Sequence, residues 1–94
     1  MSARPSAGYR LAVTREGDEA PIVYRGFVHL PDADLAIVIQ IDRDKGEASA
    51  RIDAEPSRSA SEVRALEVAA SRLVKSAAKN LPRTIVRWRE MPAS

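Results

Sequence analysis

Cysteine is absent from the 94-residue chain, and histidine occurs once, at His29. Without cysteine there are no disulfides or thiolate metal sites, so packing alone must hold the core. The longest apolar run, Leu35 to Ile39, is five residues long, whereas about 18 are needed to cross a bilayer. The first residues also lack the apolar stretch of a secretory signal. We therefore expect one soluble, cytoplasmic domain without membrane contact.

Groups for catalysis and cofactor binding are equally scarce. His29 stands on an expected strand, and no glycine-flanked turn presents a serine to it as a nucleophile. Asp42 and Asp44 resemble the opening of a calcium loop, but Gly46 comes one residue before the position that such a loop requires. The glycines are scattered singly, so no phosphate-binding loop can form. We predict no enzyme, no metal and no cofactor.

The net charge of +2 hides an uneven distribution along the chain. Residues 1–57 carry seven basic and ten acidic residues, a net charge of −3, whereas residues 58–94 carry eight and three, a net charge of +5. Between positions 72 and 89 there is no acidic residue. This stretch predicts either a solvated basic face or a surface for phosphates, nucleic acid or another anion. Its cations are Arg72, Lys75, Lys79, Arg83, Arg87 and Arg89.

Four segments in the first half alternate apolar and polar residues, as half-buried strands do. They are residues 9–14, 22–30, 35–41 and 48–54, separated by turn-forming residues. The third is the most apolar and should be central, buried largely on both faces. Gly26 interrupts the second, and an isolated glycine in a strand predicts a bulge or bend at which the two faces exchange.

After Pro56 the period changes to that of a helix. Ser59 followed by Glu62 is a capping-box pattern, and Pro82 ends the segment. The apolar stripe at helical spacing consists of Val63, Leu66, Ala69, Ala70, Leu73 and Ala77.

Residues 84–91 then suggest a short final strand, on which Val86 and Trp88 share one face. The order predicts an α+β fold in which a four- to five-stranded antiparallel sheet is covered on one face by one long helix. Residues 9–91 form this domain. Residues 1–8 are expected to be a disordered arm and residues 92–94 a disordered tail.

One helix cannot cover both faces of such a sheet. An uncovered apolar face favours a protein-interaction module, a homodimer or a subunit, with Val23, Phe27, Val38 and Trp88 as interface residues. Trp88 is interpreted as a core or interface anchor. The alternative is a nucleic-acid-binding domain that uses the basic helix and C-terminal strand. A ligand pocket between helix and sheet, in a small enzyme or carrier, is a third interpretation.

Overall fold

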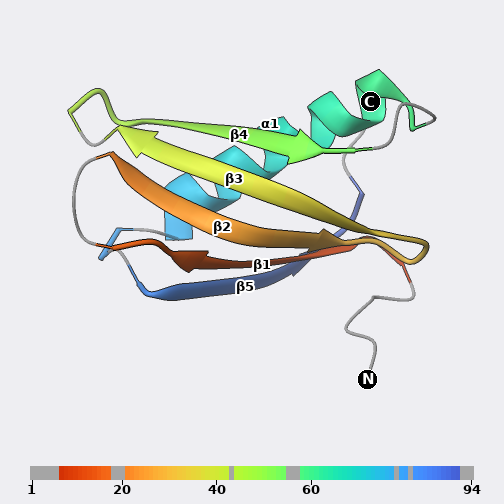
Figure 1. Ribbon diagram of the computed structural model, residues 1–94, viewed down its shortest axis with the longest axis horizontal. Coiled ribbons are helices and arrows are strands. Elements are labelled where there is room, and N and C mark those ends of the chain that lie inside the picture. The colour runs from red at the N-terminus through yellow and green to blue at the C-terminus, as the bar shows by residue number, and fades with distance from the viewer. Residues whose placement is uncertain are drawn as a thin grey trace.

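A computed structural model describes residues 7–17, 21–42, 44–54, 58–77, 79–80 and 82–91. The expected arm therefore lies outside the described residues except for Ala7 and Gly8, and the expected tail lies outside them entirely. The chain forms five strands and one helix (Figure 1), in the predicted order. They are β1 (Tyr9–Arg15), β2 (Ile22–His29), β3 (Asp34–Asp42), β4 (Glu47–Asp53), α1 (Ala60–Ala77) and β5 (Thr84–Arg89).

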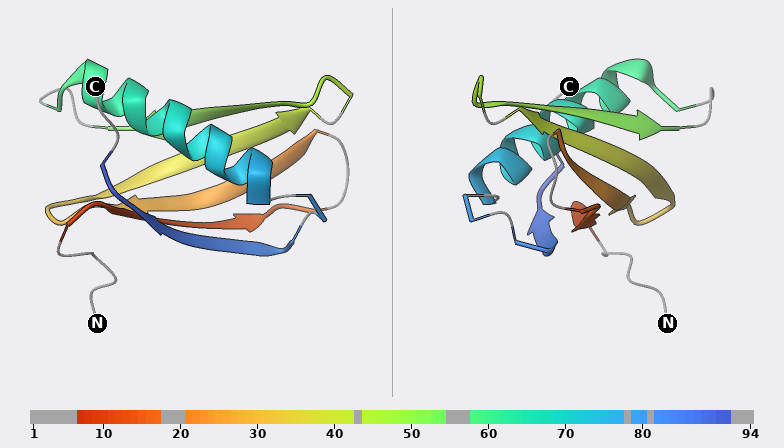
Figure 2. Two further views of the ribbon diagram at one scale, coloured as in Figure 1. Left: turned by 180° about the vertical axis from the view of Figure 1, so that it is seen from behind. Right: turned by 60° about the vertical axis from the view of Figure 1, so that its left-hand side comes forward.

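All five strands belong to one antiparallel sheet with the order β4-β3-β2-β1-β5. The first four strands form a meander, and β5 returns to pair with β1. The helix crosses one face of the sheet diagonally (Figure 2) and carries the chain from the β4 edge to the β5 edge. The predicted α+β fold is confirmed. The sequence did not predict the neighbour of β5.

The core lies between this face and α1. Alternate residues of the strands point into it, and the helix contributes Leu66, Ala70 and Val74. The backbone amide of Glu62 donates to the Ser59 hydroxyl over 3.3 Å, as in the predicted helix cap. The buried sheet residues are Tyr9, Leu11, Val13, Ile22, Tyr24, Val28, Leu35, Ile37, Ile39, Ile41, Ile52 and Ile85. No helix within the described residues is long and apolar enough to cross a membrane.

Gly26 does not mark a bulge, and this part of the prediction is wrong. β2 pairs without interruption with Val13 and its neighbours on one side and with Ile37 and its neighbours on the other. The faces do not exchange either, since Tyr24 and Val28 are both buried. A Cβ at Gly26 would collide with the carbonyl oxygen of Ala12, so glycine is required because β1 passes too close for a side chain.

Two contacts fix the start of β5. The hydroxyl of buried Tyr24 donates to the carbonyl oxygen of Pro82 over 2.6 Å. The amide of Arg15, at the end of β1, donates to the carbonyl oxygen of Arg83 over 2.7 Å. Burial raises the pKa of Tyr24 against the opposing effect of the Arg15 charge. A polar anchor on the core side thus sets where the last strand begins.

Candidate functional site: the open face of the sheet

The sheet face opposite α1, called here the open face, is not covered by another element of the described chain (Figure 2). Two large apolar side chains stand exposed on it, Phe27 at 47% and Trp88 at 55%. Val23 and Val38 are half-buried and lie on the same face, since Val23 shares the alternation of Phe27 along β2 and Val38 pairs with exposed Arg25 of that strand. All four residues predicted for an interface therefore share one surface. Trp88 is not in the core, so that part of its interpretation is wrong.

A cluster of aromatic and basic groups occupies one end of the open face. We define it as Arg10, Phe27, His29 and Trp88. The guanidinium of Arg10 lies 5.4 Å from the centroid of the Trp88 ring, within the range of a cation–π contact. The Phe27 and His29 rings stack with centroids 5.9 Å apart, and Nδ1 of His29 lies 2.7 Å from Oδ1 of Asp34.

Strand pairing assembles this cluster from distant parts of the chain. Arg10 is the direct cross-strand partner of His29 on one side and of Trp88 on the other. Residues opposite each other in an antiparallel pair have neighbouring side chains on the same face. Sequence reasoning assigned no role to Arg10, because its two aromatic neighbours become adjacent to it only in the folded sheet.

Charged side chains of both signs surround the apolar residues of the open face. Val38 on β3 lies between two arginines, since it pairs with Arg25 on β2 and with Arg51 on β4. Arg25 also forms an ion pair with Glu16. Besides Arg10, Arg25 and Arg51, the cross-strand register brings three carboxylates to this face, Asp34, Asp42 and Asp53. The open face therefore has an apolar centre and charges that nearly cancel.

Side chains cover the backbone at both edges of the sheet. At the β4 edge, the amide of Ile52 donates to Oε2 of Glu67 on the helix over 2.8 Å. At the β5 edge, Nη1 of Arg87 donates to the carbonyl oxygen of Val86 over 2.8 Å, and Nη1 of Arg89 donates to that of Trp88 over 2.7 Å. Exposed edge strands invite pairing with other chains, and such side chains obstruct it.

The basic residues predicted as an anion or nucleic-acid surface do not form one continuous stripe. Arg72 and Lys75 lie on α1 beside Glu47 at the start of β4. Arg87 and Arg89 lie on β5, and β4 and β5 occupy opposite edges of the sheet. All six of these basic side chains, including those of Lys79 and Arg83, are exposed.

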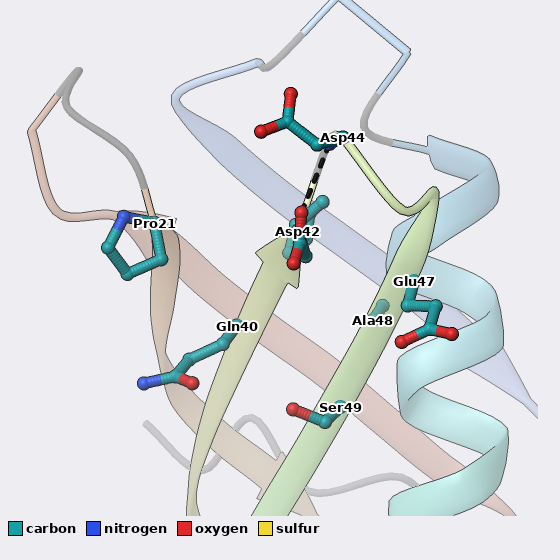
Figure 3. A pocket seen from close by; sticks show the side chains of 8 residues that line it. Pro21, Gln40, Asp42, Asp44, Glu47, Ala48 and Ser49 are labelled. Carbon is teal, nitrogen blue, oxygen red and sulfur yellow. Dashed lines mark hydrogen bonds between the residues drawn. The ribbon is translucent and has the colours of Figure 1, made fainter.

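A shallow concavity lies beside the β3–β4 hairpin, between Pro21 and the ends of the two strands (Figure 3). Oδ1 of Asp42 accepts hydrogen bonds from the amides of Asp44 and Lys45, at 3.0 and 3.2 Å. Gly46 has a φ of +66°, as expected for a hairpin loop. The described residues contain no group of three metal-ligating side chains placed to hold an ion. Asp42 therefore shapes the turn.

Comparison of the chain with protein-family models, with curated proteins and with solved structures gives no match. We therefore infer function from the geometry of the open face and of the two edges.

Proposed function

We propose that this protein is a non-enzymatic interaction module that self-associates through the open face, with a second copy of the chain as the partner. The observation that carries the proposal is the exposure of Phe27 and Trp88 at 47% and 55% on a face that also holds Val23 and Val38. An apolar centre with a charged rim is the usual composition of a protein interface. Aromatic and arginine side chains contribute most strongly to binding at such centres.

The balance of charge favours a protein partner over nucleic acid on this face. A surface that binds phosphates needs an excess of cations, because the affinity comes largely from neutralising the backbone. The open face instead combines Arg10, Arg25 and Arg51 with carboxylates such as Asp34 and Asp53. Charges of both signs on one patch can pair with those of a second copy related by a two-fold axis.

The size of the open face is also appropriate for a dimer. A sheet of five strands spaced about 4.8 Å apart and about 20 Å long presents on the order of 500 Å² in projection. Side chains make the accessible surface larger than its projection, which brings it toward the roughly 800 Å² per partner of a standard interface.

The two edges disfavour self-association by strand pairing. Glu67 occupies the amide of Ile52 at the β4 edge. Two copies meeting at the β5 edge would place Arg87 and Arg89 against the same arginines of the partner, and like charges directly opposite are destabilising. Contact between two open faces has neither obstacle.

Sedimentation velocity over a range of protein concentrations tests the proposal. The unaltered chain should sediment as a dimer that dissociates on dilution. Because Phe27 and Val38 need not be fully buried for folding, Phe27→Asp and Val38→Asp should give folded monomers. Ser76→Asp, an exposed position on α1, is the matched control and should remain dimeric. A chain that is monomeric at high concentration contradicts the proposal.

A further inference from the structure

A second surface, the outer edge of β5, has a pattern that self-association does not use. β5 has β1 on one side, and no strand of the described chain on the other. The carbonyl oxygens of Val86 and Trp88 point to this outer side, where the Arg87 and Arg89 side chains reach them. In an antiparallel ladder the amide of a residue points to the same side as its carbonyl. Val86 and Trp88 thus present both backbone groups to an added strand.

The side chains along this edge alternate in chemistry. Val86 and Trp88 face the open side of the sheet, since they pair with Ala12 and Arg10 of β1. Arg87 and Arg89 face the helix side and are exposed. Arg83, directly before the strand, adds a third exposed cation. An extended peptide beside β5 would meet apolar groups on one face and guanidinium groups on the other.

We propose that the β5 edge binds an extended peptide segment of another protein in which acidic and apolar residues alternate. The peptide adds as a sixth strand, and its amides replace the guanidinium donors at the carbonyls of Val86 and Trp88. Arg87 and Arg89 are then released to pair with the peptide carboxylates, for which the guanidinium fork is well suited. Main-chain hydrogen bonds supply affinity and the alternating side chains supply specificity, as in other strand-addition complexes.

The arginines also explain why this edge accepts an acidic strand and rejects its own copy. Their bonds to the backbone are exposed to solvent, so exchanging them for carboxylate contacts leaves no buried group without a partner. A strand carrying the same arginines would meet like charges instead. The β4 edge lacks this property, because the group that covers it, Glu67, is acidic and hydrogen-bonded to Ile52.

Titration calorimetry with end-blocked octapeptides tests the inference, using the unaltered chain and the Phe27→Asp chain in parallel. A peptide of alternating glutamate and valine should bind, and one of alternating lysine and valine should not. Replacing Arg87 and Arg89 together by alanine should weaken binding by about tenfold or more, whereas replacing Arg72 and Lys75, which removes the same charge from the helix, should leave it unchanged.

A backbone-methylated peptide separates strand addition from simple attraction between charges. Two methylated forms of the glutamate–valine peptide are compared. In each form the alternate amides along one of the two edges are N-methylated, which removes the ladder donors of that edge and leaves every carboxylate in place. Methylation along the edge that faces β5 should abolish binding, whereas methylation along the opposite edge should preserve it. Amide exchange at Val86 and Trp88 should slow with the unmodified peptide and with the form methylated on the opposite edge, and it should not slow with the form methylated on the facing edge. Equal binding of both methylated forms, or no binding of the unmodified peptide, overturns the inference. Binding retained in Phe27→Asp shows that the edge acts independently of the open face.

Discussion

Arg10 on β1 and Trp88 on β5 are direct cross-strand partners, and the guanidinium of Arg10 lies 5.4 Å from the centroid of the Trp88 ring. The contact joins residues from opposite ends of the chain. It holds the only tryptophan on the surface of the sheet, where it is 55% exposed. Because the ring lies on the open face, its environment reports directly on whether that face is covered.

Tryptophan fluorescence should therefore depend on protein concentration. When a second copy covers the open face, Trp88 loses water, and its emission maximum should move to shorter wavelength as the concentration rises. Ser76→Asp should show the same shift, and Phe27→Asp should emit at long wavelength at every concentration. An emission maximum that is independent of concentration while sedimentation reports association would place the interface on another surface.

Replacement of Gly26 should be far more costly than replacement of a loop glycine. A Cβ at Gly26 would collide with the Ala12 carbonyl and approach the Cα of Val13 to 2.8 Å. Overpacking typically costs about 1–3 kcal/mol, and a clash with backbone that cannot rotate away belongs at the upper end. Gly26→Ala should therefore lower the free energy of unfolding by about 3 kcal/mol in urea titrations. Gly17→Ala is the control, because its φ of +79° is strained for alanine but nothing lies within 4 Å. It should cost only about 1 kcal/mol. Equal losses would contradict the close approach of β1 and β2.

The hydrogen bond from Tyr24 to Pro82 predicts a measurable loss in Tyr24→Phe. The variant keeps the ring and removes the hydroxyl that donates over 2.6 Å, which should lower the free energy of unfolding by about 1 kcal/mol. Amide exchange in β5 should become faster, since this bond fixes the start of the strand. Unchanged exchange in β5 would show that the Arg15–Arg83 contact is sufficient by itself.

The tyrosines also predict how stability depends on alkaline pH. Burial raises the pKa of both Tyr9 and Tyr24, against the opposing charges of Arg89 and Arg15 respectively. A raised pKa in the folded state means that the unfolded chain loses its protons first. The stabilisation is therefore complete below a pH of about 10, the ordinary tyrosine value, and is lost as the pH rises through the folded-state values. Ultraviolet titration of the folded chain should show both tyrosines ionising at a higher pH than an exposed tyrosine. A tyrosine that ionises at the pH of an exposed one would contradict the burial of that side chain.

Glu67 predicts a specific effect at the β4 edge. Glu67→Ala removes the acceptor of the Ile52 amide, and loss of one such bond should cost about 1–2 kcal/mol. Glu67→Gln retains an acceptor oxygen and should recover much of the loss. Hydrogen exchange at Ile52 measures the effect directly, with fast exchange in the alanine variant and slower exchange in the glutamine variant. The same exchange rate in the unaltered chain and in both variants would show that Glu67 does not protect the Ile52 amide.

Local patterns explain why much of the fold was predictable. Alternation in residues such as Leu35, Ile37 and Ile39 identified the strands and their buried face, and the Ser59 cap identified the start of the helix. The pairing of β5 with β1 was not predictable, because it joins residues 70 or more positions apart, such as Arg10 and Trp88. Gly26 was misinterpreted for the same reason, since its constraint comes from the neighbouring strand.

The candidate site was predictable only in its apolar part. Alternation placed Phe27 and Val38 on an uncovered face, and the structure gives them that position. Arg87 and Arg89 can act at an edge only because β5 is the outermost strand. No local sequence pattern predicts which strand of a sheet is outermost. Their hydrogen bonds to the preceding carbonyls are visible only in the folded chain.

Sedimentation velocity of the unaltered chain and of Phe27→Asp, each measured at low and high protein concentration, decides whether two copies of the chain associate through the open face. If the open face is the interface, the unaltered chain is a dimer and the variant is a folded monomer, with a circular dichroism spectrum unchanged by the substitution. A monomer for the unaltered chain at high concentration, or a dimer that persists in Phe27→Asp, would contradict this assignment of the interface.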